Sequence, residues 1–283
     1  MTEGYGESLR CAVQERDVLP FIGIYDVFSA GMVSRHFDAV FCSGFGFAAS
    51  YYGLPDIGFI AWSDMLNFVH RVRTILPEHH VLVDIDDGYC DIEVAAHVAT
   101  QMERVGASGV VLEDQKRPRM CGHFEGKQIM PLDEFLPKLS RVLEAREDLF
   151  VIARTDSSDP DDVARRLRAF VDEGADAVLV DGVKDLNIIE QLSSHIGVPL
   201  TFNQIAGGKS PPTTLTELQR RGVQLVIYST PLLFAAQEAI DCTLQDLKLV
   251  DGQLPHGPDT IGVKRCTAVL QENHRRTRSR IAV

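Results

Sequence analysis

The sequence lacks the features that would place the protein in a membrane or in an oxidising compartment. No apolar stretch in its 283 residues approaches the ~20 needed to span a bilayer. The N-terminus, MTEGYGESLRCAVQERD, lacks the basic and then apolar order of a signal peptide. The six cysteines are widely spaced and form no CxxC pair, which argues against a zinc site or a disulfide framework. We therefore expect a cytoplasmic protein with reduced thiols and no membrane partner.

Positive charge is also scarce. The chain has 28 Lys and Arg against 40 Asp and Glu, a net charge of −12, which disfavours a nucleic-acid-binding surface. Hydrophobic residues make up 45% and charged residues 24%, as in ordinary folded domains. The length suits two modest domains or one barrel-sized domain.

Eight short, β-branched apolar runs recur along the chain. They are 21–24, 39–44, 80–86, 109–114, 150–155, 177–182, 199–204 and 224–229. Most are apolar throughout rather than alternating, as expected where helices cover the outside of a sheet and side chains fill its inside. Amphipathic helical patterns such as 91–106 and 162–174 fill the intervals, and no linker interrupts them. The alternation predicts an α/β fold, one (β/α)8 barrel over residues 1–283, rather than an open doubly wound sheet.

The C-terminal part of the chain has no strand to accompany it. A long helical stretch follows the last strand, and the tail, 250–283, carries a further helical pattern at 259–278. In a barrel, such a tail commonly packs on a neighbouring subunit. We therefore expect a homo-oligomer, a dimer or a tetramer.

Polar residues follow most of the predicted strands at their carboxyl ends, where barrel active sites lie. These residues are Asp84, Asp86, Asp87, Glu113, Asp114, Arg154, Asp156, Asp181 and Asn203. A lone Asp near a strand end is usually a helix cap or a turn former, which suits Asp161 and Asp162. Acids on two adjacent strand ends, with Arg on the next, instead predict a metal or anion site. Oxygen ligands select Mg²⁺ or Mn²⁺. Asp84 and Asp86, two apart on a strand, should point the same way, whereas Asp87 should be structural.

Seven motifs occur in the order found in the isocitrate lyase/phosphoenolpyruvate mutase superfamily, which the chain resembles from about residue 18 to 240. They are SGFGFAAS, GLPDIG, DIDDGY, EDQKRPRMCGH with EGK, IART, NQIAGGKSP and VIYSTPLLFAA. The D-x-D-x-G-Y and Cys-Gly-His patterns are specific when they occur together.

The resemblance implies a barrel that binds Mg²⁺ and an α-oxo- or α-hydroxycarboxylate, often as a tetramer with exchanged C-terminal helices. By this resemblance, Asp84 would ligate Mg²⁺ directly, and Asp86, Glu113 and Asp56 would coordinate it or hold its waters. Ser43, Gly44 and Phe45 resemble the turn that holds the substrate carboxylate, Arg154 resembles the arginine that pairs with substrate, and Asn203 and Asp181 belong to the substrate side.

Residues 115–131 resemble the family's mobile gating loop, which closes over bound substrate and excludes water. Members with Cys-Gly-His on this loop are mainly C–C lyases that act on isocitrate, methylisocitrate and alkylmalates. By resemblance, Cys121 would protonate the departing carbon, with Arg119 and His123 beside it on the loop. Carboxyphosphonoenolpyruvate mutases share the motif, so the loop alone does not decide between lyase and mutase.

Two positions depart from the lyase pattern. The loop reads Arg119-Met120 where lyases usually have Lys-Lys or Lys-Arg, and Asp181 stands where relatives have histidine or glutamate. With Arg119-Met120, either the substrate carries less negative charge than isocitrate or the chemistry differs from that of the lyases. An acid at position 181 disfavours an anionic substrate group nearby. The leading hypothesis is a Mg²⁺-dependent C–C lyase that makes a short 2-oxoacid and a second carboxylate. The alternatives are a phosphonomutase, an oxaloacetate-type decarboxylase, or a barrel that has lost activity.

Overall fold

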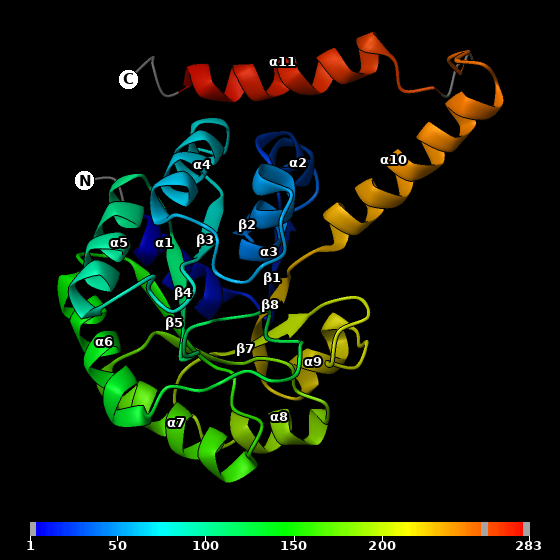
Figure 1. The fold of residues 1–283 in the computed structure, drawn as a ribbon. Coiled ribbons are helices and arrows are strands. Elements are labelled where there is room, and N and C mark those ends of the chain that lie inside the picture. The colour runs from blue at the N-terminus through cyan, green and yellow to red at the C-terminus, as the bar shows by residue number, and fades with distance from the viewer. Residues whose placement is uncertain (1–3, 256–259, 280–283) are drawn as a thin grey trace.

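The computed structural model describes residues 4–255 and 260–279, and its centre is a closed barrel of parallel strands. Each strand pairs with the next along the chain, and the first pairs with the last. The strands are β1 (Leu19–Ile24), β2 (Ala39–Cys42), β3 (His80–Asp84), β4 (Gly109–Glu113), β5 (Phe150–Thr155), β6 (Ala177–Val180), β7 (Leu200–Gln204) and β8 (Val223–Tyr228). All eight predicted strands and the barrel fold are confirmed, with ends that differ by one or two residues (Figure 1).

Helices surround the barrel and cover the outward faces of its strands (Figure 1). They are α1 (Tyr5–Glu15), α2 (Val27–Val33), α3 (Gly44–Phe47), a π-helical turn η1 (Ala48–Tyr52), α4 (Trp62–Ile75), α5 (Ile92–Arg104), α6 (Leu132–Ala145), α7 (Pro160–Glu173), α8 (Leu186–Ser193), α9 (Leu215–Arg220), α10 (Pro231–Leu249) and α11 (Val263–Ser279). Within the described ranges, none of these helices combines the length and the hydropathy needed to cross a membrane.

Helix α1 closes the amino-terminal end of the barrel. Its Leu9 and Val13 are buried in one cluster with inward-facing strand residues such as Phe21, Phe150 and Leu225. Because packed apolar side chains fill this end, polar chemistry can be placed only at the opposite end, where the strands terminate in acids.

The start of α7 differs from the prediction that Asp161 and Asp162 are caps or turn formers. The cap is Asp159, whose carboxylate accepts the backbone N–H groups of Asp161 and Asp162. Pro160 occupies the first helical position, so the helix begins two residues earlier than a cap at Asp161 would allow. Asp162 lies in the first turn and pairs with Arg166.

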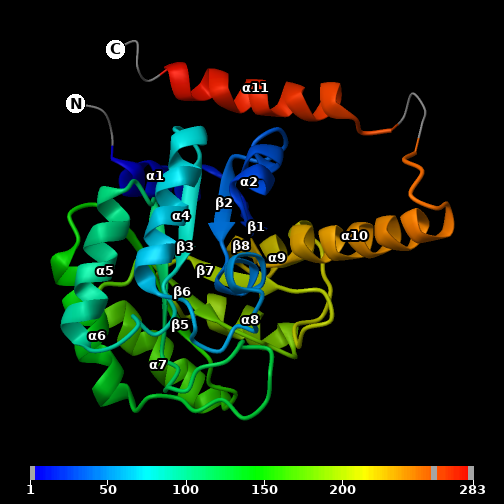
Figure 2. The ribbon, with the colours of Figure 1, turned by 45° about the horizontal axis from the view of Figure 1, so that its top comes forward.

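The two C-terminal helices leave the barrel and return to it. Helix α10 extends away from the strands and has no buried residue, and α11 comes back across α2 and α4 of the same chain (Figures 1 and 2). On α11, Asn273 is buried against Gly31, and Arg276 donates to Ser34. The predicted helix in the tail is therefore present, although residues 256–259 and 280–283 lie outside the described part. Exchange between subunits stays a prediction.

Candidate active site

The polar end of the barrel gathers side chains from neighbouring strands. Asp84 ends β3, Glu113 ends β4, and Arg154 lies on β5 directly opposite Glu113 in the strand register. Asp181 follows β6, and Asn203 lies on β7. Apart from Asp84, which is 7% exposed, each is at most 6% exposed, so they meet in one buried polar layer.

Asp86 also lies in this layer, although, contrary to the prediction, it does not belong to the strand that ends at Asp84. It lies beyond the end of β3 in a turn, with φ of 51°, so strand alternation does not set its direction. Its carboxylate nevertheless lies near that of Asp84. A Cβ on Gly44 would be 3.0 Å from Oδ2 of Asp84 and 3.4 Å from Oδ1 of Asp86. The bare backbone of Gly44 thus lies against both acids.

The guanidinium of Arg119 lies among the acids assigned to the metal. Arg119 is 2% exposed, its Nη1 is 2.5 Å from Oδ1 of Asp56 and 3.2 Å from Oδ1 of Asp86, and its Nε donates to Oε1 of Glu113 at 2.9 Å. The structure therefore places this predicted loop residue inside the acid cluster formed by Asp56, Asp84, Asp86 and Glu113.

The negative charge of the acid cluster is only partly neutralised by neighbouring cations and hydrogen bonds. Burial raises the pKa of Asp84, raises that of Asp86 well above its usual value, and raises that of Glu113 to about 7. Both carboxylate oxygens of Asp86 and Oε2 of Glu113 are buried without a hydrogen bond. Among the described residues, Arg119 pairs with Asp56, Asp86 and Glu113, and Arg154 pairs with Glu113, so two guanidinium groups lie against four acids.

The donor atoms of this cluster suit a hard divalent cation, since they are carboxylate oxygens with unfilled hydrogen-bonding capacity. Their arrangement in this structure does not suit such a cation. Across residues 4–255 and 260–279, no group of three or more His, Cys, Asp or Glu side chains is spaced to hold a metal ion. The chemistry of the predicted ligands therefore fits Mg²⁺, but the cluster with Arg119 in it is not a formed metal site.

Arg154 forms ion pairs with three carboxylates. It donates to Asp156 at 2.8 and 3.1 Å, its Nη2 lies 2.6 Å from Oδ2 of Asp181, and its Nη1 lies 3.3 Å from Oε2 of Glu113. Burial alone would raise the pKa of Asp181, but Arg154 and His123 hold it well below its usual value. A substrate anion that approaches Arg154 must therefore share it with fixed carboxylates.

His123 lies behind Asp181, and the cavity is lined without it. Its Nδ1 accepts the backbone N–H of Lys209 at 2.8 Å, so Nε2 carries the hydrogen that faces Oδ1 of Asp181 at 3.2 Å. Asn203 donates to the same Oδ1 at 2.9 Å and accepts from Ser229 at 2.7 Å. These contacts hold Asp181 in place. His123 therefore positions Asp181 and does not itself line the cavity.

Loop 115–131, for which we predict a gating role, lies over the polar end of the barrel. Its two ends are joined by an antiparallel bridge between Gln115 and Ile129, and Arg117 donates to both oxygens of Asp87 at 2.8 and 2.7 Å. Lys127 donates to Asp156 at 2.7 Å and to the carbonyl of Gly122. Asp87 thus anchors the loop, in line with its structural assignment.

Asp114, one of the rim acids, is a second anchor. Its carboxylate accepts the backbone N–H of Asp156 at 3.0 Å and pairs with Arg166 at 3.1 Å, and its carbonyl accepts from Met130 at the end of the loop. Burial raises its pKa to about 6. These contacts direct it away from the cavity.

The closed loop leaves a cavity of about 30 Å³ over the acids, room for no more than a few waters. The lining includes Ser43, Phe45, Asp56, Asp84, Arg119, Cys121, Gly122, Arg154, Asp181, Asn203 and Ser229. A dicarboxylate cannot enter this space, so the loop must open to admit one. Burial raises the pKa of the Cys121 thiol to about 11, which keeps it protonated at neutral pH.

Sequence reasoning gave no role to Lys127, Asp156 and Ser229. The "EGK" segment could have indicated Lys127, because it lies within the loop motif, and Asp156 was recognised only as a rim acid. No local pattern distinguishes Ser229 from any serine at the end of a strand; only its 2.7 Å hydrogen bond to Asn203 does so.

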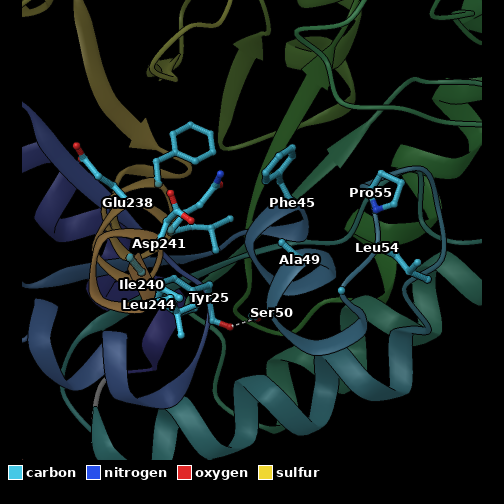
Figure 3. A pocket seen from close by; sticks show the side chains of 15 residues that line it. Tyr25, Phe45, Ala49, Ser50, Leu54, Pro55, Glu238, Ile240, Asp241 and Leu244 are labelled. Atoms are coloured by element: carbon cyan, nitrogen blue, oxygen red, sulfur yellow. Dashed lines mark hydrogen bonds between the residues drawn. The ribbon is translucent and has the colours of Figure 1, made fainter. Parts of the chain in front are cut away.

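A second, larger hollow of about 1060 Å³ lies between α10 and the α3–η1 segment. Phe45, which also lines the small cavity, meets Phe234 of α10 edge to face at 6.1 Å. Figure 3 shows Phe45 and Ala49 on one side of this hollow and Ile240 and Leu244 on the other. Ile240 and Leu244 are each 60% exposed, so α10 presents unpartnered apolar surface.

Comparison with known proteins places these features among enzymes. The profile of the phosphoenolpyruvate phosphomutase family matches residues 9–248. The 2-methylisocitrate lyase of Bacillus subtilis (strain 168) is 32% identical over 231 residues, which cover 80% of this chain and 75% of that protein. A crystal structure of 2,3-dimethylmalate lyase superposes with a TM-score of 0.90 at 29% identity, covering 97% of this chain and 95% of the other. A structure of oxaloacetate acetylhydrolase superposes equally well, at 30% identity and over 96% and 95% of the two chains.

Proposed function

The chain belongs to the phosphoenolpyruvate phosphomutase family of the isocitrate lyase/phosphoenolpyruvate mutase superfamily, and on this basis we propose that it is a Mg²⁺-dependent carbon–carbon lyase. Its substrate would be a 2-hydroxy di- or tricarboxylate of the alkylmalate or methylisocitrate type, cleaved to a short 2-oxoacid and a second carboxylate. Mn²⁺ could replace Mg²⁺, because both accept oxygen ligands.

One observation carries the proposal: a protonated thiol shares one small cavity with two members of the acid cluster, Asp56 and Asp84. Cys121 lines the same small space as Asp84 and Arg154, and its pKa of about 11 keeps the thiol protonated at neutral pH. Cleavage of a C–C bond beside a hydroxyl-bearing carbon leaves electrons on the departing carbon, which must then receive a proton. Phosphoryl transfer needs no such proton. The thiol is therefore better suited to a lyase than to a mutase.

The chain's own residues would divide the remaining work. Asp84, with Asp86, Glu113 and Asp56, would hold the metal, which when bound supplies Lewis acidity at the substrate oxygens. Ser43, whose Oγ accepts the N–H of Gly46 at 3.1 Å, keeps its hydroxyl hydrogen for a substrate carboxylate. Loop closure would exclude water and bring Cys121 to the departing carbon.

Asp181 and the commitment of Arg154 favour a substrate with few anionic groups. Arg154 already faces carboxylates of Glu113, Asp156 and Asp181. A tricarboxylate would place a further charge beside Asp181, whereas an alkylmalate would present an apolar substituent there. We therefore place dialkylmalates before methylisocitrate in the order of candidate substrates.

Two alternatives follow from the same relationships. The family's phosphomutase description and the shared Cys-Gly-His motif support a phosphonomutase, and the oxaloacetate acetylhydrolase structure supports action on oxaloacetate, including decarboxylation. A non-catalytic barrel is least favoured, since the acids, Arg154 and the thiol all line one cavity.

The unpartnered apolar surface of α10 supports a homo-oligomer, a dimer or a tetramer, in which a neighbouring subunit covers it. We also propose a cytoplasmic location.

The test is a substrate screen with the purified full chain and Mg²⁺. It would contain 2,3-dimethylmalate, 2-methylisocitrate and isocitrate, with oxoacid release followed as the phenylhydrazone. Oxaloacetate would be followed by carbon NMR of its products, and phosphoenolpyruvate by phosphorus NMR. Oxoacid formed from a 2-hydroxy di- or tricarboxylate supports the proposal. Turnover of phosphoenolpyruvate-type substrates alone, seen by phosphorus NMR, would replace it with the mutase alternative. Turnover of oxaloacetate alone would replace it with the oxaloacetate reaction.

A further inference from the structure

Arg119 is the largest fully buried side chain in the described part of the protein, and it comes from a loop. The aliphatic part of its side chain passes beside Gly58, and its guanidinium nitrogens contact Asp56, Asp86 and Glu113. A charged side chain on a solvent-facing loop would ordinarily remain hydrated, because burial of a charge is costly unless paired charges offset it. The pairing with three carboxylates supplies that offset here.

The acids that hold Arg119 are also those proposed to hold the metal. Asp86 and Glu113 keep three buried oxygens without hydrogen bonds even with Arg119 present, so the guanidinium does not satisfy the cluster fully. It also leaves the acids unsuited to an ion, since no three of them are spaced as ligands in the described ranges. One guanidinium and one divalent cation at the centre of the same acids would repel each other.

We propose that Arg119 is a tethered counter-ion that competes with the divalent cation for the acid cluster. With the loop closed and the metal absent, Arg119 occupies the cluster; metal binding displaces it and loosens loop 115–131. This inference rests on the proposed metal-binding role of the cluster. It implies an order of events in which the metal binds first, the loop loosens and substrate enters. When the loop closes again over both, the side chain of Arg119 must lie outside the position that it holds without metal.

Other contacts of the loop make this displacement specific to Arg119. Arg117, two residues away, also pairs with an acid, Asp87, but its side chain is 40% exposed and its partner lies outside the acid cluster. Lys127 pairs with Asp156, which is not one of the acids proposed to hold the metal. Only Arg119 connects the loop to the proposed ligands, so only its contacts are broken when a cation takes those oxygens.

The first test is isothermal titration of the full chain with Mg²⁺, and with Mn²⁺ as a second probe. If Arg119 occupies the cluster about 90% of the time, Arg119→Gln should bind Mg²⁺ about tenfold more tightly, because apparent affinity scales with the fraction of competent sites. Arg117→Gln is the matched control: it removes the same charge from the same loop and should change the affinity less than about threefold.

The second test measures the accessibility of the loop to a protease and does not depend on the reaction. Endoproteinase Lys-C can cut after Lys116 and Lys127 in all three proteins. Mg²⁺ should accelerate cleavage in the wild type and in Arg117→Gln. In Arg119→Gln cleavage should already be fast without Mg²⁺ and should change little when it is added.

Each outcome decides the matter. Equal or weaker Mg²⁺ affinity in Arg119→Gln, with normal binding in the wild type, would overturn the competition and leave the proposed function intact. Failure of all three proteins to bind Mg²⁺ or Mn²⁺ would overturn both. If Arg119→Gln does not fold without metal, Arg119→Lys replaces it. Lysine cannot reproduce the two-sided contacts of arginine, so Mg²⁺ should bind more tightly than in the wild type and raise Tm by more. Equal or weaker binding there would again refute the competition.

Discussion

Gly122 lies where the closed gating loop meets the wall of the cavity, and its replacement by alanine should block closure. A Cβ at this position would be 2.0 Å from Oδ2 of Asp181, 2.4 Å from Nη2 of Arg154 and 2.5 Å from Oδ1 of Asp156. All three atoms belong to buried ion pairs, including the 2.6 Å pair of Arg154 with Asp181, so none can move aside without breaking a contact. The loop itself must therefore shift by roughly 1 Å to reach ordinary carbon–oxygen contact.

The expected effect on turnover is large. A 1 Å misplacement of a reacting group can cost ~10²-fold, and a mispositioned acid forfeits part of the ~10²–10⁴-fold that acid catalysis contributes. We therefore expect Gly122→Ala to lower kcat by ~10²-fold or more. Substrate binds before the loop closes, so KM should change much less. Gly122 is not among the glycines with positive φ, so alanine adds no strain to its own backbone, and the effect of the change should come from the displaced loop.

Gly126 on the same loop provides the control. It has φ of 89°, and a Cβ there would meet nothing within 4 Å, so Gly126→Ala adds local strain without obstructing closure. Its kcat should fall by about 30-fold at most, because a left-handed residue costs on the order of 1–2 kcal/mol and each 1.4 kcal/mol is about tenfold in rate. Oxoacid release gives kcat, and Lys-C cleavage gives loop protection. A Gly122→Ala enzyme with kcat within tenfold of wild type and a fully protected loop would refute the account of closure.

Five further predictions follow from the site, the tail and the core. Cys121→Ser should cut kcat by ~10²–10⁴-fold with little change in KM, because serine is a much poorer acid, and unchanged turnover would show that the thiol only packs. Because burial raises the pKa of Cys121 to about 11, wild-type kcat should show no loss assigned to this thiol between pH 7 and 9, and a fall near pH 8.5 that Cys121→Ser removes would contradict this. Asp84→Ala should abolish activity while circular dichroism stays unchanged, and EDTA should do so reversibly; full activity in a metal-free preparation would disprove the metal assignment. Deletion of residues 250–283 should lower the mass measured by light scattering, whereas a full-length chain that is already monomeric would refute the oligomer. Burial lowers the pKa of His80 to about 4, so the folded state binds fewer protons than the unfolded chain. The stability that depends on a neutral His80 is therefore lost as the pH falls from about 6.5 towards 4. In urea unfolding, the wild type should lose roughly 2 kcal/mol more than His80→Gln between pH 6.5 and 5, and parallel curves for the two proteins would contradict this.

The fold could be predicted from the sequence because its signals are local. A strand that is buried on both faces must be apolar along its whole length, and runs such as 150–155 and 177–182 show this without reference to any partner. The repeated alternation with helical patterns then permits few arrangements other than a closed parallel barrel. Barrel topology in turn places Asp84, Glu113 and Arg154 at one rim, since all strand ends face the same way.

The direction of other polar side chains could not be predicted in this way. Asp86 and Asp87 diverge as predicted, one towards the acid cluster and the other towards Arg117, but a left-handed turn after β3 separates them and strand alternation does not. Asp114 follows Glu113 directly, yet it anchors Arg166 and the end of the loop. Helix α11 lies on α2 and α4 of its own chain, and its amphipathic pattern alone did not indicate which surface it would cover.

By itself the sequence determined the barrel, the rim that carries the chemistry and the loop that covers it. Only the tertiary structure decided that Arg119 lies inside the acid cluster, that His123 lies behind Asp181, and that Cys121 is buried enough to stay protonated. The physical reason is the range of the forces involved. Backbone hydrogen bonding and the alternation of apolar residues act over a few neighbours in sequence. Ion pairing and desolvation depend on groups brought together from distant positions, such as Asp56 and Arg119, and those distances exist only in the folded chain.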